Sequence, residues 1–165
     1  MKKLFAALLV LVPALCLANM PASQGIDYVL VKKAERKIFL MRGGAPVKEY
    51  QISLGLRPVG HKVFEGDMRT PEGLYVLDWR NANSKFYKSI HISYPSPSDA
   101  ARARSLGKPA GGMIMIHGLP NKKKDLDEQL LMSSDWTEGC IAVSNQAMDE
   151  IWESVADGTP IVILP

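Results

Sequence analysis

The chain has 165 residues, of which 47% are hydrophobic and 22% are charged, and its formal net charge is +3. This length suits one globular domain, and the apolar content is too high for a disordered chain. Two cysteines are too few for a disulfide scaffold or a four-cysteine zinc site, and no basic stripe dense enough for nucleic acid is present. Thirteen glycines and eleven prolines indicate many turns, which favours short strands over a helix bundle.

The first 18 residues have the features of a secretory signal peptide. Two lysines precede an uncharged run, residues 4–17, which is shorter than the roughly 20 residues of a membrane-spanning helix. Cys16 and Ala18 occupy the −3 and −1 positions of a cleavage site before Asn19. We expect residues 1–18 to be removed, with a retained membrane anchor as the alternative. The mature chain then has 18 basic and 17 acidic residues and one cysteine, Cys140.

The rest of the chain, residues 26–165, shows no internal repeat or linker and is predicted to form one mainly β domain. Alternating patterns and short apolar runs between turn residues predict the strands. In chain order these are residues 26–30, 37–41, 47–54, 74–79, 89–94, 113–116 and 161–164. Gly43 and Gly44 supply a hairpin turn between the second and third of these strands.

Two short helices are predicted as well. The first covers residues 98–106, with Ser98 as its N-cap and Gly107 at its end. The second begins after Ser144 and is stopped by Gly158. It carries Met148, Ile151, Trp152 and Val155 on one face.

Cys140 is the candidate nucleophile of the mature chain. A lone thiol in an oxidising compartment is buried and inert, paired between chains, or reactive. The polar turn 137–139 precedes Cys140, and the apolar residues Ile141 and Val143 follow it. The thiol is therefore expected where a loop enters a buried element, which is typical of a reactive group on a rigid scaffold.

A nucleophilic cysteine needs a base, and the chain offers His61, His91 and His117. His117 ends a buried strand and precedes Gly118, whose carbonyl could orient the ring. We expect His61 to be solvated in its loop, and His91 to have a structural or substrate-side role. The pattern therefore favours Cys–His acyl transfer, with backbone N–H groups near Cys140 holding the oxyanion.

Metal binding is the alternative use of these side chains. The cysteine and histidines lack the ligand spacing of a metal motif, so neither a metal nor a cofactor is expected. A redox function is weaker still, because Cys140 has no resolving cysteine.

Two segments carry a family resemblance. Ile116–His117–Gly118 followed by Thr137–Glu138–Gly139–Cys140–Ile141 resembles the signature of the L,D-transpeptidase catalytic (YkuD) domain. Thr70–Pro71–Glu72–Gly73 also looks like that family's TPxG turn. The resemblance implies a mixed β-sandwich or barrel with two short helices, located in the periplasm. It also implies a cysteine that attacks peptidoglycan stem peptides at the carbonyl of diaminopimelate and forms a thioester.

The resemblance also implies roles for individual residues. Cys140 would be the nucleophile and His117 the base, oriented by the carbonyl of Gly118. Thr137 and Gly139 would shape the oxyanion site. The 22 residues between His117 and Cys140, which include 119–136, would form a substrate lid. Trp136 and Glu138 are the candidate substrate contacts, although Trp136 could instead pack against the lid.

Two positions depart from the family pattern and leave the acyl acceptor open. Many members have a histidine in place of Glu138 and an arginine or asparagine in place of Ala142. The chain resembles a Gram-negative branch that includes amidases acting between diaminopimelate and an attached lipoprotein. Transfer to an amine, hydrolysis, and a catalytically silent peptidoglycan-binding module all remain possible. We expect a monomer without a stable membrane span, acting on stem peptides and, in the amidase case, on a wall-linked lipoprotein.

Overall fold

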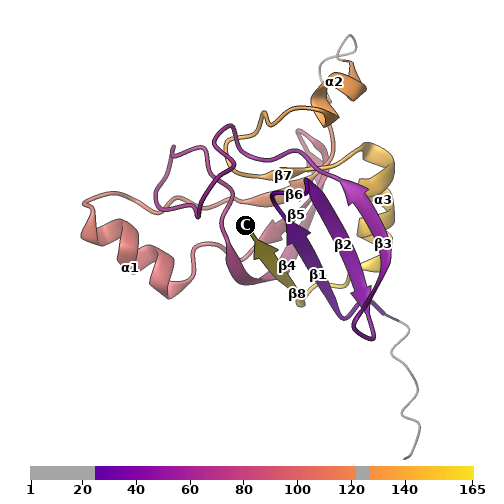
Figure 1. Cartoon of the computed structure of the whole chain (residues 1–165), viewed down its shortest axis with the longest axis horizontal. Coiled ribbons are helices and arrows are strands. Elements are labelled where there is room, and N and C mark those ends of the chain that lie inside the picture. Colours follow the sequence, from indigo (N-terminus) through magenta and orange to yellow (C-terminus); the bar gives the residue numbers. More distant parts are fainter. Residues whose placement is uncertain (1–24, 122–126) are drawn as a thin grey trace, which may run out of the picture.

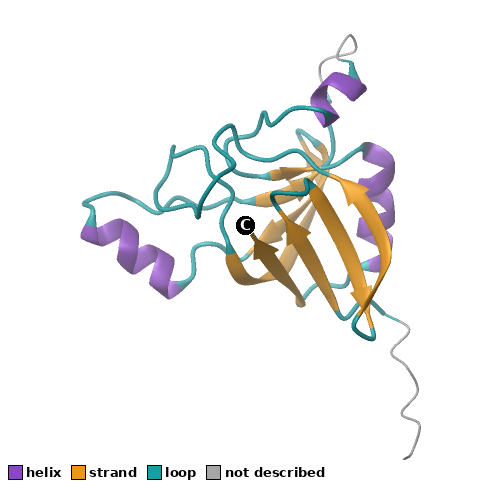
Figure 2. Ribbon diagram, viewed as in Figure 1, coloured by secondary structure: helices purple, strands orange, loops and turns teal. Residues whose placement is uncertain are grey.

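Eight strands form one mixed sheet in the computed structural model, which describes residues 25–121 and 127–165 (Figures 1 and 2). The predicted signal peptide lies outside these residues. The order of strands across the sheet is β3-β2-β1-β8-β4-β5-β6-β7. Their bounds are β1 Tyr28–Lys32, β2 Lys37–Arg42, β3 Ala45–Gln51, β4 Gly73–Ser84, β5 Tyr87–Ile92, β6 Met115–His117, β7 Ile141–Ala142 and β8 Thr159–Leu164. The helices are α1 Pro97–Ser105, α2 Glu128–Met132 and α3 Asn145–Ser154.

The β2–β3 hairpin forms as its sequence predicts. Gly43 and Gly44 connect the strands with φ angles of 57° and 78°, the positive values that a tight hairpin turn requires. The closing strand β8 lies between β1 and β4, parallel to the first and antiparallel to the second. The sheet is therefore mixed, with its last strand near the centre.

The two edges of the sheet are joined to one another. Ser53, just beyond β3, forms an antiparallel bridge with Ala142 of β7, through N–O distances of 2.9 and 2.8 Å. Gly55 bridges Thr137 in the same region. These bridges close the sheet in the manner of a barrel, and they bring the segment after β3 against the turn that carries Cys140.

The core fills the inner face of the sheet, and α3 packs against it beside β5. Ser144 caps α3 as predicted, because its side chain accepts the N–H of Ala147. Met148 and Ile151 are buried in the core, and Trp152 packs against it while partly exposed. The helix ends at Ser154, before the predicted stop at Gly158.

The mainly β class is confirmed, but details of the helices differ from the prediction. α1 begins earlier, because Ser96 and Asp99 form a capping box around Pro97, so Ser96 rather than Ser98 is the N-cap. A third helix, α2, lies within the predicted lid, capped by Asp127. Five residues are too short for a helical period to be visible in the sequence. Among residues 25–121 and 127–165, no helix is long and apolar enough to span a bilayer.

Candidate active site

His117 and Cys140 lie on neighbouring strands. β6 and β7 pair in parallel, with Ile116 opposite Ile141 and His117 opposite Ala142, and Cys140 directly precedes β7. Ile116 and Ile141 are fully buried in the core. Because side chains alternate along strands, His117 and Cys140 both leave the opposite face of this pair. The sheet register therefore places the two predicted reactive residues on the same face of this strand pair.

The imidazole of His117 is held at one nitrogen only. Its Nδ1 lies 2.7 Å from the carbonyl oxygen of Gly118, so Nδ1 carries the proton and donates it. In the neutral ring, Nε2 is then an acceptor, and it has no hydrogen-bond partner among the described residues. His117 is only 3% exposed, and this burial lowers the pKa of its imidazole. The ring is therefore neutral at pH 7 with a free basic nitrogen.

Gly118 fits its position because it has no side chain. A Cβ atom there would lie 2.5 Å from Asn145 Oδ1, the oxygen that accepts the N–H of Leu119. The residue that orients His117 is thus packed against the first turn of α3. The helix and the base are positioned together.

The turn before Cys140 is tied internally by Thr137. Its Oγ1 donates to the carbonyl of Cys140 at 2.8 Å and accepts the N–H of Gly139 at 3.1 Å. Of the two N–H groups expected to hold an oxyanion, that of Gly139 is therefore already used. The N–H of Cys140 has no recorded partner among the described residues and is the remaining candidate.

Gly139 itself is required by geometry. Its φ of 136° disfavours other residues, and a Cβ atom would lie 2.6 Å from the carbonyl oxygen of Arg69. The next residue, Thr70, is fully buried, and its Oγ1 accepts the N–H of Gly55 at 3.2 Å. The Thr70–Gly73 turn thus begins directly under the cysteine turn and supports it.

The sulfur of Cys140 is held between backbone groups of one segment. Sγ lies 3.6 Å from the carbonyl oxygen of Met113. Burial raises the pKa of the thiol, and the backbone of Met115 and the ammonium of Lys62 act against this rise, whereas Glu138 adds to it. The thiol is therefore protonated at neutral pH and needs a base to become a nucleophile.

Aromatic rings cover the imidazole of His117. Phe86 and Trp136 lie 4.6 and 5.7 Å from it, measured between ring centroids. Nε1 of Trp136 is buried and has no hydrogen-bond partner in the described part of the chain. Trp136 is therefore part of the wall around the base, and its unpaired N–H is the one polar group of this wall that a ligand could satisfy.

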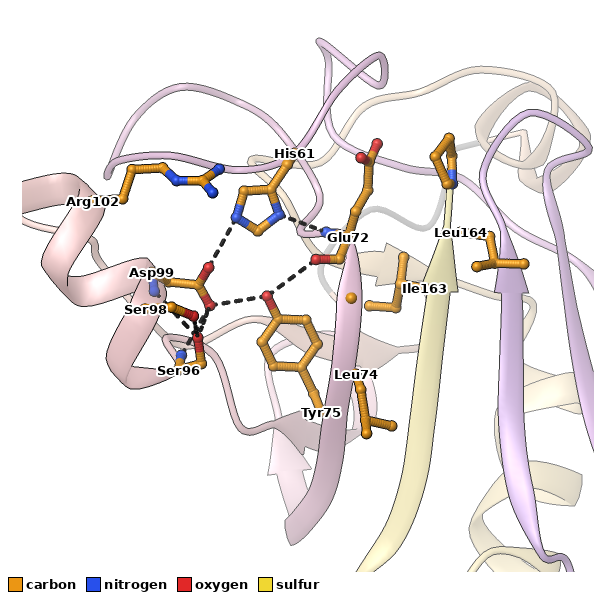
Figure 3. Close-up of a pocket in the computed structure, with 12 residues that line it drawn as sticks. His61, Glu72, Leu74, Tyr75, Ser96, Ser98, Asp99, Arg102, Ile163 and Leu164 are labelled. Carbon is orange, nitrogen blue, oxygen red and sulfur yellow. Dashed lines mark hydrogen bonds and ion pairs between the residues drawn. The ribbon is translucent and has the colours of Figure 1, made fainter.

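His61 is not solvated, contrary to expectation. Figure 3 shows its ring between Asp99 and Glu72. Nδ1 accepts the backbone N–H of Glu72 at 3.0 Å, and Nε2 donates to Asp99 Oδ1 at 2.9 Å. The hydroxyl of Tyr75 also donates to Asp99, at 3.0 Å. No pattern in the sequence indicates this network, because its members come from a loop, a strand and the first turn of α1.

The cavity beside His61 is separate from the one at Cys140. It has a volume of about 610 Å³, and Figure 3 shows its lining, which includes Leu74, Arg102 and Leu164. The polar groups of its wall bind one another, as the network around Asp99 shows. The cavity of Cys140 has a volume of about 310 Å³ and shares no residue with it.

His91 has a structural environment. Its Nδ1 lies 2.7 Å from Asp78 Oδ1, and its ring stacks on Trp79 with 4.8 Å between centroids. It lines neither of the two cavities. Within residues 25–121 and 127–165, no cluster of three or more His, Cys, Asp or Glu side chains could hold a metal ion.

The sequence reasoning missed Lys62. This lysine is 3% exposed, forms an ion pair with Asp67 at 2.8 Å and lines the cavity of Cys140. A lysine in a glycine-bounded loop is typical of a solvated surface, so no pattern in the sequence signalled its burial. Glu138 lines the same cavity and is exposed, as a substrate contact would be.

The model of the L,D-transpeptidase catalytic domain (YkuD) matches residues 26–163. The chain belongs to this family. It is 30% identical over 135 residues to a protein of Escherichia coli K12 named "Putative L,D-transpeptidase YafK". The match covers 78% of this chain and 46% of YafK, so the chain spans less than half the length of that relative.

Solved structures agree with the family. The helical cell shape determining protein Pgp2 of Campylobacter jejuni superposes with a TM-score of 0.62 at 27% identity, over 82% of this chain and 46% of Pgp2. An L,D-transpeptidase of Xylanimonas cellulosilytica superposes with a TM-score of 0.52 at 16% identity, over 87% of this chain and 64% of that one. The second likeness shows the fold alone.

Proposed function

We propose that the protein is a cysteine-dependent acyl transferase that acts on peptidoglycan stem peptides, with Cys140 as nucleophile and His117 as base. The observation that carries the proposal is that the imidazole of His117 is bound at one nitrogen only. Its Nδ1 donates to Gly118 O, and its Nε2 has no recorded partner among the described residues. Its strand pairs with the strand that Cys140 precedes. The names of its relatives support the substrate class, since one is an L,D-transpeptidase and another determines cell shape.

The reaction begins with a neutral pair. Burial lowers the pKa of His117 and raises that of Cys140, so the proton rests on sulfur until substrate is bound. Nε2 then takes this proton as the sulfur attacks the carbonyl of diaminopimelate. The N–H of Cys140 donates to the resulting oxyanion. The oxyanion collapses to a thioester, and the leaving amine takes the proton back from the imidazolium.

The second half of the reaction depends on the acceptor. An amine of a second stem peptide would attack the thioester and pass a proton to Nε2. The C–S bond then breaks, the sulfur of Cys140 takes this proton back from the imidazolium, and the new amide is the cross-link. Water would give a free carboxylate, which is the carboxypeptidase or amidase outcome; in the amidase case the first leaving amine is a lysine of a wall-linked lipoprotein. Ala142 is fully buried, so the position at which many family members carry arginine or asparagine offers no side chain to a donor peptide here. This supports a donor contact different from that of such members.

The proposal also includes the cellular location and the oligomeric state of the protein. Residues 1–18 act as a signal peptide that delivers a monomer to the periplasm, where residues 26–165 form the catalytic domain. No cofactor takes part in the steps above, because each proton moves between sulfur, imidazole and amine.

Defined muropeptides test the function. The purified chain is incubated with a disaccharide tetrapeptide, with and without an amine acceptor, and products are separated by mass. A new 3→3 cross-link indicates transpeptidation, and free tripeptide indicates hydrolysis. A lipoprotein-linked muropeptide tests the amidase alternative in the same way.

Cys140→Ala is the control for every arm of this experiment, and a carbapenem adduct on Cys140 is the covalent readout. Intact protein without any product and without an adduct would contradict the proposal. Wall binding that Cys140→Ala leaves unchanged would then favour the silent binding module.

A further inference from the structure

Cys140 shares its cavity with a buried cation. The cavity of about 310 Å³ is lined by Lys62 from the loop between β3 and β4, by the backbone around Met113, and by Glu138 and Cys140. Lys62 is 3% exposed. A lysine side chain is almost never this buried unless its ammonium is paired, because burial of an ammonium costs desolvation free energy. The burial of Lys62 therefore indicates a role for its ammonium.

The loop binds the ammonium of Lys62 through two oxygen atoms. Nζ of Lys62 donates to Asp67 Oδ1 at 2.8 Å and to the carbonyl of Phe64 at 3.2 Å. Burial alone would raise the pKa of Asp67, but the bond from Lys62 and the backbone N–H groups of Val63, Arg69 and Phe64 outweigh it, and the pKa is lowered. Asp67 therefore remains ionised, and the pair persists at neutral pH.

A second buried lysine shows what a purely structural ammonium looks like. Lys33 is 2% exposed and uses all three of its N–H groups, on Gly60 O at 2.8 Å, Thr70 O at 3.0 Å and Glu72 Oε1 at 2.8 Å. Lys62 has only two recorded acceptors among the described residues. The ammonium of Lys62 also lies 6.0 Å from the ring centroid of Tyr94, but one of its N–H groups has no recorded acceptor oxygen among the described residues, and its side chain lines the cavity that contains the sulfur.

We propose that Lys62 is a positioning residue for Cys140, whose buried ammonium stabilises the thiolate across the cavity that the two share. The inference deepens the proposed function and rests on it, because it concerns the sulfur that His117 deprotonates. When Nε2 takes the thiol proton, negative charge appears on Sγ, and Lys62 is the cation that lines the same space. An opposite charge nearby favours the charged form of a group, most strongly where water is excluded.

Other charges face the same space and set the net effect. Glu138 opposes Lys62, because its carboxylate is negative and lines the cavity. The charged residues that line the cavity are Lys62, Glu65 of the same loop, and Glu138. Asp67 pairs with Lys62, and His117 lies on β6, which pairs with the strand that follows Cys140. Removal of the charge of Lys62 should therefore raise the pKa of the Cys140 thiol, and removal of the charge of Glu138 should lower it.

The test reads the thiol directly. The rate of alkylation of Cys140 by iodoacetamide is measured against pH by intact mass, in Lys62→Met, Lys62→Arg, Glu138→Gln and Lys108→Met. Lys108→Met is the matched control, because it removes the same charge from an exposed side chain that contacts the same loop, 3.7 Å from the ring centroid of Phe64, but does not line the cavity. The midpoint of the profile reports the coupled thiol and imidazole in every variant.

Lys62→Met should move the midpoint to higher pH, with the rate at pH 7 falling about tenfold for each pH unit of displacement. Lys62→Arg should restore most of the rate, Glu138→Gln should move the midpoint to lower pH, and Lys108→Met should superpose on the parent protein. A merely structural role of Lys62 would leave the midpoint in place, even where the melting temperature falls.

A second variant and a comparison with muropeptide activity distinguish loss of folding, failure of this inference and failure of the proposed function. If Lys62→Met does not fold, the double variant Lys62→Met, Asp67→Asn leaves no unpaired buried charge and takes the same measurement. An unchanged midpoint in the folded variant overturns the inference, even if muropeptide activity requires Cys140. A shifted midpoint without muropeptide activity supports the role of Lys62 while contradicting the proposed function.

Discussion

His61 and His117 differ in how many of their ring nitrogens the fold uses. His61 is bound on both sides, through Nδ1 to the N–H of Glu72 and through Nε2 to Asp99 (Figure 3). His117 is bound on one side, through Nδ1 to Gly118 O. The neutral rings are therefore opposite tautomers, with the proton on Nε2 in His61 and on Nδ1 in His117. Hydrogen-bond capacity left on the ring therefore distinguishes His117 from His61. Within the described residues, His91 is also bound at one ring nitrogen only, to Asp78, so a free nitrogen is required of a base but does not by itself identify one.

The largest effect is expected when the free ring nitrogen of His117, Nε2, is removed. His117→Gln should lower the rate of thioester formation by about 10²- to 10⁴-fold, the usual contribution of a general base. Stopped-flow acylation by a carbapenem measures it, and His61→Gln is the control. Equal losses in the two variants would mean that the ring nitrogens do not distinguish the histidines.

Substitution of the other histidine, His61, should lower stability instead of the rate of acylation. His61→Ala leaves Asp99 without one donor and the N–H of Glu72 without its acceptor, so the free energy of unfolding should fall by about 1–3 kcal/mol. Urea denaturation measures this loss. Carbapenem labelling of Cys140 should continue in the folded variant, and its disappearance would place His61 in the reaction.

A smaller effect should appear in the pH dependence of stability. Burial lowers the pKa of His117 in the folded protein, whereas in the unfolded chain the histidine titrates near about 6.5. As the pH falls below that value, the unfolded chain binds the proton first, so the free energy of unfolding decreases until the pH reaches the lower, folded pKa. His117→Gln should show a shallower decrease between pH 7.5 and 5.5 in urea titrations. A slope identical to that of the parent protein would contradict the neutral ring.

The smallest expected change concerns the wall beside His117. Trp136→Phe keeps an aromatic ring near His117 but removes the buried Nε1–H that has no partner. Stability should change by less than about 1 kcal/mol, since no hydrogen bond is lost. Thermal melting measures this, and a marked loss of muropeptide turnover with unchanged melting would assign Nε1 to substrate binding.

Much of the fold could be predicted because it depends on local patterns. The Gly43–Gly44 hairpin, the Ser144 cap and the apolar strands each leave a signal within a few residues. The pairing of β6 with β7 left no such signal, since β7 has only two residues and follows a long insertion. The family resemblance supplied that proximity where the pattern alone could not.

The environments of charged residues could not be predicted. His61 and Lys62 are adjacent in a loop, yet one binds Asp99 of α1 and the other binds Asp67. The partners of His61 are remote in sequence, and Lys62 is buried only because the loop folds over the cavity of Cys140. Burial of a polar side chain depends on tertiary packing, which the sequence of one loop does not encode by itself.

Lys33 has a consequence for the motion of that loop. Its ammonium binds the carbonyls of Gly60 and Thr70, the residues at which the segment 61–69 begins and ends. One side chain thus acts as a non-covalent cross-link across nine residues, and it removes much of the entropy that so short a loop would otherwise gain by opening. We therefore expect the segment to fluctuate little between these two bonds, which keeps Lys62, Glu65 and Gly66 in place along the cavity of Cys140.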